Sequence, residues 1–221
     1  MDGVLSAGTI LALYERGVAA GPAARAALLF AASGGTTPVE TVPLGDIDRQ
    51  IQSLHPSLHD GPVAATATCR ACGTALEFAL PPEFERPAKT GNDPVQVAHH
   101  GQTYAVRMPR LSDLGPQGID LAALAPDAPW SDPDFVVAAE TSLEQSDPGL
   151  RVTIGLTCHD CGSVQTQVLD ISGFIWALIE QAARRLIRDI ATLARTFGWS
   201  EAEIITMSAR RRALYLAEVA R

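Results

Sequence analysis

The sequence predicts an α+β fold, with short helices first, antiparallel β hairpins in the middle and one long amphipathic helix near the end. Apolar residues recur at helical steps of three and four near both ends, and apolar and polar residues alternate in two central stretches. A C-x-x-C-G motif lies inside each alternating stretch. These patterns divide the chain into an N-terminal helical part (1–60), a β part with a long insertion (61–170) and a C-terminal helical part (171–221).

Composition restricts the class of protein. The chain has 221 residues, of which 47% are hydrophobic and 19% charged, so it can bury an ordinary core. Asp and Glu outnumber Lys and Arg, 25 to 17, and the net charge of -8 disfavours binding to phosphate backbones. No apolar run reaches the roughly 18 residues of a membrane span. Asp2 stands where a secretory signal would be basic, so we expect a cytoplasmic chain without membrane insertion.

Helix signals dominate the first 60 residues. Ser6 can cap a first helix, and Gly21 followed by Pro22 separates it from an alanine-rich second helix. Residues 37–40 have the spacing of a capping box. A third short helix is predicted at 47–54.

The central part changes to strand periodicity. Residues 63–68 and 76–80 flank the first cysteine motif, and residues 151–156 and 164–168 flank the second. Residues 164, 166 and 168 are predicted to form the apolar face of the last strand. Each cysteine pair is therefore expected in a hairpin turn.

The insertion between the two motifs gives weaker signals. Val97 and residues 104–108 look like strands, closed off by Pro109. Residues 114–133 are expected to form a loop with one helical turn near 120–124.

The C-terminal part gives the clearest pattern. An apolar stripe covers about six turns of a helix over residues 174–197, and Gly198 is placed to end that helix. Residues 200–203 form a second capping box that starts a short helix, and Ser208 can cap a last one.

The four cysteines carry the most specific chemistry. Cys69 and Cys72, and then Cys158 and Cys161, have the spacing of zinc knuckles, in which both thiolates reach one metal and the following glycine permits the turn. Two knuckles complete a tetrahedral Zn site without an open position, so the predicted site is structural and the β part is expected to be zinc-ribbon-like. The fold must then bring together two knuckles that are separated by 85 residues.

Other uses of these thiols stay open. They are disulfides within each pair, redox chemistry, or an iron site on the same four sulfurs. Disulfides need an oxidising compartment, and a thioredoxin-like pair needs a strand-to-helix context that neither motif has.

The histidines are weaker candidates for metal ligands. His99 and His100 are adjacent, so strand geometry would point them to opposite faces, and we expect surface side chains. His159 lies inside the second knuckle, where four cysteines already suffice.

No sequence motif indicates catalysis. The chain has no nucleophile elbow, no phosphate-binding glycine loop and no H-E-x-x-H, so we expect neither an enzyme nor a small-molecule substrate.

A partner-binding surface is predicted near the C-terminus. Residues 174–221 contain eight arginines against five acidic residues, a balance of +3 that leaves -11 for the rest of the chain. This segment carries side-chain types that are enriched in protein interfaces. The predicted partner-binding residues are Trp199, Arg210, Arg211, Arg212 and Tyr215. In the alternative, the two aromatic residues pack the short helices onto the long one.

Several segments together resemble one family. The two cysteine motifs are among them. The others, in chain order, are Leu5-Ser6-Ala7, Tyr14-Glu15-Arg16, Arg25-Ala26-Ala27-Leu28-Leu29, Leu44-Gly45-Asp46-Ile47-Asp48, Leu76-Glu77-Phe78, Tyr104-Ala105-Val106-Arg107-Met108-Pro109, Asp113-Leu114, Phe174-Ile175-Trp176, Leu193-Ala194, Phe197-Gly198-Trp199-Ser200-Glu201 and Met207-Ser208-Ala209-Arg210-Arg211-Arg212-Ala213-Leu214-Tyr215-Leu216. This order resembles the baseplate proteins of contractile phage tails and of phage-derived extracellular contractile injection systems, which are related to T-even baseplate hub assembly proteins.

The resemblance implies a non-enzymatic structural component or assembly factor of a baseplate, with other baseplate or hub proteins of a phage tail-like particle as its partners. Two other hypotheses remain. A zinc-ribbon module for nucleic acid or transcription would need a basic ribbon face, whereas the residues around these knuckles are acidic or neutral. An iron electron-transfer site would make the protein coloured.

Overall fold

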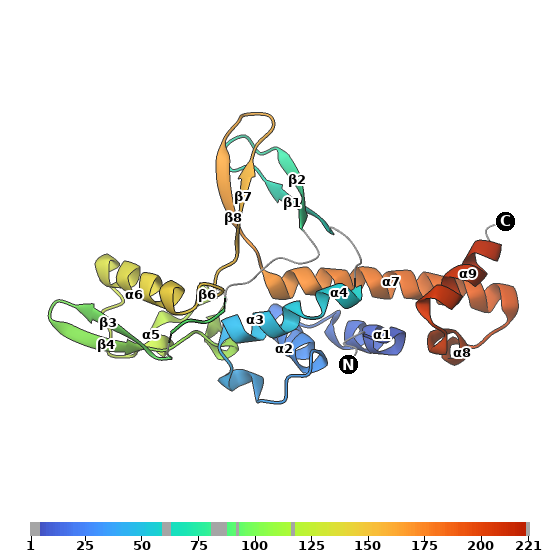
Figure 1. Ribbon diagram of the computed structural model, residues 1–221, viewed down its shortest axis with the longest axis horizontal. Helices are drawn as coiled ribbons and strands as arrows, with labels where there is room; N and C mark the ends of the chain where they lie inside the picture. Colours follow the sequence, from blue (N-terminus) through green and yellow to red (C-terminus); the bar gives the residue numbers. More distant parts are fainter. Residues whose placement is uncertain (1–4, 59–62, 81–87, 92, 116–117, 220–221) are drawn as a thin grey trace.

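The computed structural model describes residues 5–58, 63–80, 88–91, 93–115 and 118–219 (Figure 1). Within these ranges the chain combines helices with short antiparallel hairpins, which confirms the predicted α+β class. The helices are α1 (Ala7–Gly17), α2 (Pro22–Ala32), α3 (Leu44–Gln52), α4 (His55–Leu58), α5 (Leu121–Leu124), α6 (Pro133–Ser146), α7 (Ile171–Phe197), α8 (Glu201–Thr206) and α9 (Ala209–Val219). Short 3-10 helices are η1 (Val39–Thr41) and η2 (Leu111–Asp113).

The strands of the described residues pair antiparallel, each with its neighbour in sequence. They are β1 (Val63–Thr68) with β2 (Ala75–Leu80), β3 (Val95–His99) with β4 (Gln102–Val106), β5 (Leu114–Gly115) with β6 (Gly118–Ile119), and β7 (Thr153–Thr157) with β8 (Val164–Val168). In Figure 1 the β1–β2 and β7–β8 hairpins project together from the long helix α7. The β3–β4 hairpin and α6 lie toward one end of the molecule, and α8 and α9 lie at the other.

One apolar core joins the two predicted helical parts. Helices α1 to α4 pack on α7, and the buried residues include Leu29 and Ile47 from the N-terminal part and Ile175 and Ile179 from α7. The core is therefore built from residues far apart in sequence. The division of the chain into three parts stays a prediction.

A glycine marks the closest approach of α1 to α7. A Cβ atom at Gly17 would overlap the Trp176 ring, so only glycine fits there without a shift. Arg25 lies over the same ring, with its guanidinium carbon 4.7 Å from the Trp176 ring centroid. The same guanidinium donates hydrogen bonds of 2.9 Å to the carbonyls of Gly17 and Val18, which ties α2 to the end of α1.

The long helix and its successors confirm the C-terminal predictions. Asp170 caps α7 by accepting a hydrogen bond from the Gly173 N–H at 2.9 Å, and Gly198 ends it with a left-handed φ of 70°. Ser200 and Glu203 form the predicted capping box of α8. Ser208 Oγ accepts from the Arg211 N–H at 3.2 Å at the start of α9.

Two N-terminal predictions need correction. The capping box expected at residues 37–40 is wrong, because η1 is a three-residue 3-10 helix with Pro38 at its N-cap and no side-chain cap there. The third helix occupies Leu44–Gln52, so it begins three residues before the predicted 47–54. Its first N–H, at Leu44, donates to the Pro109 carbonyl at 2.8 Å, so a contact with the insertion accompanies the early start.

The insertion has its own core. Phe135 and Ala139 of α6 pack against Val97 and Val106 of the β3–β4 hairpin, and Met108 is fully buried beside them. Helix α6 was not expected from the sequence. Short α5 confirms the predicted helical turn, and residues 116–117 of the expected loop lie outside the described residues.

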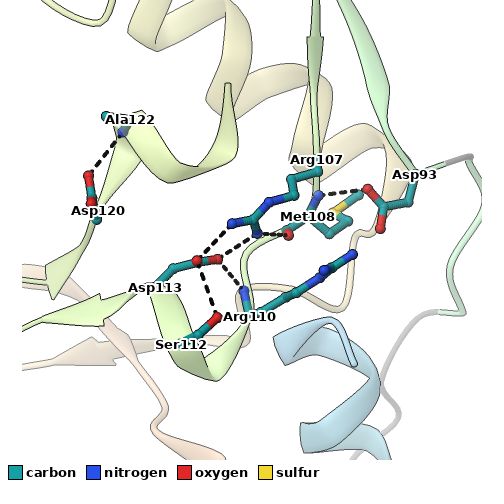
Figure 2. Close-up of polar contacts among 8 residues, drawn as sticks. All are labelled: Asp93, Arg107, Met108, Arg110, Ser112, Asp113, Asp120 and Ala122. Atoms are coloured by element: carbon teal, nitrogen blue, oxygen red, sulfur yellow. Dashed lines mark hydrogen bonds and ion pairs between the residues drawn. The ribbon is translucent and has the colours of Figure 1, made fainter. Parts of the chain in front are cut away.

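Polar contacts join residues of the insertion to one another on either side of Pro109 (Figure 2). Asp113 accepts hydrogen bonds from both terminal nitrogens of the Arg107 guanidinium at 2.6 and 2.8 Å, and from the Arg110 N–H at 2.8 Å. Asp93 accepts from the Met108 N–H at 2.8 Å. The Arg107 guanidinium keeps the pKa of Asp113 below its usual value, and Asp113 in turn raises the pKa of Arg107. This network stiffens the segment that bonds to α3.

Candidate metal centre

The two cysteine turns have the same backbone geometry. In the first, the Cys69 N–H donates to Thr74 O at 2.8 Å and the Gly73 N–H to Cys69 O at 2.9 Å. In the second, the N–H groups of Cys158 and Gly162 donate at the equivalent positions, at 2.9 and 3.0 Å. Gly73 and Gly162 have φ values of 77° and 70°, so the glycine after each pair is required by the turn, as the sequence predicted.

The four sulfur atoms come together between the hairpins. Cys69 Sγ lies 3.7 Å from Cys161 Sγ, and Cys72 Sγ lies 3.6 Å from Cys158 Sγ. All four sulfurs lie within 4.8 Å of one another. Thiolates at about 2.3 Å from a tetrahedral metal would be about 3.8 Å apart, so these positions suit a single ion. The predicted clustering of these cysteines is confirmed, and the geometry is compatible with a metal site.

The cluster is closed and partly buried. Cys69 and Cys158 are buried, whereas Cys72 and Cys161 are exposed, and all four are free thiols. An ion held by four sulfurs has no open position for water or substrate. Such an arrangement offers no position at the ion for a substrate.

Hydroxyl groups and amides surround the sulfurs. Ser163 Oγ lies 3.3 Å from Cys69 Sγ and 3.2 Å from Cys161 Sγ. Its hydrogen bond, with help from the Cys72 and Ala71 amides, lowers the pKa of Cys69 to about 6. The same hydroxyl lowers the pKa of Cys161. Negative charge on sulfur is therefore favoured at two of the four positions before any cation is added.

Cys158 differs from these thiols. The Cys161 N–H favours its thiolate, but burial and hydrogen bonding to the Cys72 and Cys161 sulfurs raise the pKa of Cys158 to about 11. A divalent cation at the centre would favour the thiolate form of all four, because metal binding displaces the thiol protons. Once deprotonated, the four sulfurs concentrate negative charge in one small volume, and this charge is complementary to a cation.

Gln165 was missed by sequence reasoning. The sequence placed residues 164, 166 and 168 on the apolar face of β8, but Val164 is 76% exposed and Gln165 is buried. Gln165 Oε1 accepts from the Arg70 N–H at 2.8 Å, and its Nε2 donates to Thr68 O at 3.1 Å. This side chain therefore bonds β8 to the first cysteine turn. The alternation of Val164, Thr166 and Val168 had assigned the intervening Gln165 to solvent.

The predicted partner-binding residues lie at the far end of the long helix. Trp199 stacks on Phe197 with ring centroids 4.5 Å apart, and Tyr215 packs edge-on against Trp199 at 4.8 Å. The two aromatic residues therefore join α9 to the end of α7, as the alternative interpretation of the sequence expected.

The three arginines of α9 have different environments. Arg210 and Arg211 are exposed, and the Arg211 guanidinium lies 5.8 Å from the Tyr215 ring centroid. Arg212 is buried and donates to the Met207 carbonyl at 2.5 Å. Surface docking by this cluster can therefore use the first two arginines only.

The adjacent histidines differ from expectation, whereas His159 does not. His159 lies outside the sulfur cluster, with its Nε2 3.2 Å from Asp160 Oδ1 at the surface. The expectation that His99 and His100 point to opposite faces is wrong. His100 lies beyond the end of β3, in a turn with a positive φ of 48°, and both imidazoles approach Asp132.

Comparisons with known proteins gave no match to any protein-family model, curated protein or solved structure. In the part of the chain that the structure describes, no helix combines the length and the apolar character needed to cross a membrane.

Proposed function

We propose that this chain is a non-enzymatic structural protein in which Cys69, Cys72, Cys158 and Cys161 bind one zinc ion. The observation that carries the proposal is the approach of the four sulfurs across two hairpins that are 85 residues apart in sequence. Four thiolates in tetrahedral positions are the ligand set of structural zinc.

The small core between the hairpins supports a need for metal. Its buried residues, among those the structure describes, are Cys69, Cys158, Leu76 and Leu156. Two-stranded hairpins are marginally stable alone, and two leucines give little apolar burial. Structural zinc contributes roughly 10 to 16 kcal/mol in small peptides, enough to hold the hairpins together.

The larger role that we propose is assembly into the baseplate of a contractile phage tail-like particle in the cytoplasm. Its support is the resemblance carried by residues 197–201 and 207–216, together with the exposed Arg210 and Arg211 on a helix far from the metal centre. The partners would be other baseplate or hub proteins. A nucleic-acid ribbon is less well supported, because Asp160 and Glu77 lie in the same pair of hairpins as Arg70.

Metal analysis tests the first part. Protein purified without added metal is expected to contain one zinc per chain, and Cys72→Ser is expected to lose it. Ala71→Ser, an exposed change in the same turn, is the matched control and should keep it. A colourless protein with one zinc excludes iron, whereas a metal-free wild type would contradict the proposal.

Particle incorporation tests the second part. A tagged chain expressed from its own locus is expected to sediment with tail-like particles, and the double change Arg210→Ala and Arg211→Ala is expected to abolish incorporation while zinc content stays at one. Arg184→Ala with Arg185→Ala, exposed on α7, is the control. Normal particles from a strain that lacks this chain would contradict a baseplate role without affecting the zinc proposal.

A further inference from the structure

A second group of metal-ligating side chains lies at the turn of the β3–β4 hairpin. His99 is the last residue of β3, and the turn residues His100 and Gly101 have φ values of 48° and 79°. Because His100 leaves the strand geometry, its ring folds back toward that of His99, and the two ring centroids are 4.1 Å apart. The left-handed turn thus gives the adjacent histidines a common direction.

Asp132 supplies a carboxylate to the same place. Its Oδ1 caps α6 by accepting from the Asp134 N–H at 3.0 Å. Its Oδ2 lies 2.8 Å from His99 Nε2 and 3.7 Å from His100 Nε2. Oδ1 therefore caps the helix, while Oδ2 faces both imidazoles.

The group is rigid on one side and open on the other. The His99 side chain is 10% exposed and packs edge-on against Phe135, with centroids 5.5 Å apart. The His100 side chain is 79% exposed. His99 is thus held by the insertion core and Asp132 by the helix cap, whereas His100 borders solvent.

We propose that His99, His100 and Asp132 form a second metal site, which takes a divalent first-row transition ion such as Zn²⁺. Ligand atoms at about 2.0 to 2.2 Å from a tetrahedral ion would be about 3.4 Å apart, and the distances of 2.8 and 3.7 Å bracket that value. The ion takes the place of the proton between His99 and Asp132. The three ligand atoms all lie within 4.8 Å of one another.

The ligand chemistry distinguishes this site from the cysteine cluster. Two imidazoles and one carboxylate suit zinc, cobalt, nickel and copper, whereas magnesium and calcium prefer oxygen ligands alone. Three protein ligands leave a position open to water or to a ligand from a partner. We therefore expect weaker and exchangeable binding here, in contrast to four enclosing thiolates.

A purely structural explanation makes a different prediction. If the 2.8 Å contact only fastens the hairpin turn to α6, His100 has no function in it, because its Nε2 is beyond hydrogen-bond distance from Asp132. His100→Asn tests this directly, since asparagine tolerates a positive φ and removes the third ligand. Asp134→Asn, which removes an exposed carboxylate two residues from Asp132, is the matched control.

The experiment is a calorimetric titration of the purified full chain with Zn²⁺, with the histidine ring signals followed by NMR. The wild type and Asp134→Asn are expected to show one binding event that moves the ring signals of His99 and His100 together. His100→Asn and Asp132→Asn are expected to weaken this event at least tenfold, since losing even an outer partner of a metal ligand costs roughly 10- to 100-fold. Mg²⁺ should give no such event.

The comparison between variants identifies the site whatever the cysteines hold, because none of these substitutions touches the sulfur cluster. Equal zinc affinity in the wild type and His100→Asn would overturn the proposal. So would the absence of any shift of the His99 and His100 ring signals at millimolar zinc. Because His100 is exposed, this result does not depend on whether Asp132→Asn folds.

Discussion

The β1–β2 and β7–β8 hairpins, here called the paired hairpins, are stabilised differently from the β3–β4 hairpin. Among the described residues, the β1–β2 and β7–β8 hairpins share a core of two cysteines and two leucines. The β3–β4 hairpin packs on α6 through Phe135, Val97, Val106 and other apolar side chains. A two-stranded hairpin needs packing against something else, and one region supplies apolar area while the other supplies four sulfurs. The proposed metal would therefore take the place of an apolar core at the β1–β2 and β7–β8 hairpins, whereas the β3–β4 hairpin has such a core.

Metal removal should give the largest effect. Cys72→Ser or chelation is expected to release the paired hairpins from each other, because zinc contributes roughly 10 kcal/mol or more and the apolar contacts there are few. Hydrogen exchange should accelerate at 63–80 and 151–168 and stay slow in α7. Equal protection of these hairpins in Cys72→Ser and Ala71→Ser would show that metal is not what pairs them.

Phe135→Ala tests the other region. Removing this fully buried ring is expected to cost about 3 to 5 kcal/mol of unfolding free energy in the insertion. The zinc held by the four cysteines should stay bound, because the ring lies in a separate core, although the ring also packs against His99. Denaturant unfolding measures the first effect, and zinc analysis by absorption of the sulfur-bound ion measures the second. Val137→Ala, 62% exposed on the same helix, is the control, and a loss of the cysteine-bound zinc in Phe135→Ala would contradict the independence of the two regions.

Asp113→Asn should have a smaller, pH-dependent effect. The lost charge weakens hydrogen bonds from Arg107 and from the Arg110 N–H, at a cost of about 2 kcal/mol near pH 7. Because Arg107 lowers the pKa of folded Asp113, this stabilisation is complete above the unfolded value of about 4 and is lost as pH falls through the lower folded value.

The pH dependence is measured as a difference in unfolding free energy between wild type and variant. That difference should shrink as pH falls below about 4. Asp127→Asn, an exposed carboxylate in the same insertion, should show little difference at any pH. A gap between wild type and Asp113→Asn that stays constant down to pH 2 would refute the assigned ion pair.

Gln165→Ala should give the smallest effect in this series. It leaves the Arg70 N–H and the Thr68 carbonyl without their side-chain partner, at a cost of about 1.5 kcal/mol. Zinc should still bind, but the cysteine turn is expected to exchange its amide hydrogens faster. Gln167→Ala, two residues along the same strand, is the control. Identical exchange in the two variants would remove Gln165 from the support of the centre.

Local signals predicted the elements that are fixed by local chemistry. Ser6, Gly198 and Ser200 end or begin helices as expected, because a cap depends on residues within one turn. The cysteine motifs predicted the candidate centre, since two residues between ligands and a following glycine determine each turn. That the two turns meet could be inferred only from the needs of the metal.

Features that depend on distant partners were not predictable in this way. The buried face of β8 is set by the hairpin beside it, which uses Gln165 for bonding and leaves Val164 in solvent. Helix α6 was missed although its signals are local: Asp132 and Pro133 are a cap and a first helical residue, and Phe135, Ala139 and Leu143 repeat at the helical step of four. The histidine pair depends on a left-handed turn, which adjacency in the sequence does not indicate.

X-ray absorption at the zinc edge tests the central claim most directly. The protein as purified without added metal is expected to hold one zinc per chain, with a first shell of four sulfurs at about 2.3 Å. Cys72→Ser should lose that shell, and Ala71→Ser should keep it. A first shell containing nitrogen or oxygen in place of sulfur, or a wild-type protein without zinc, would contradict the account.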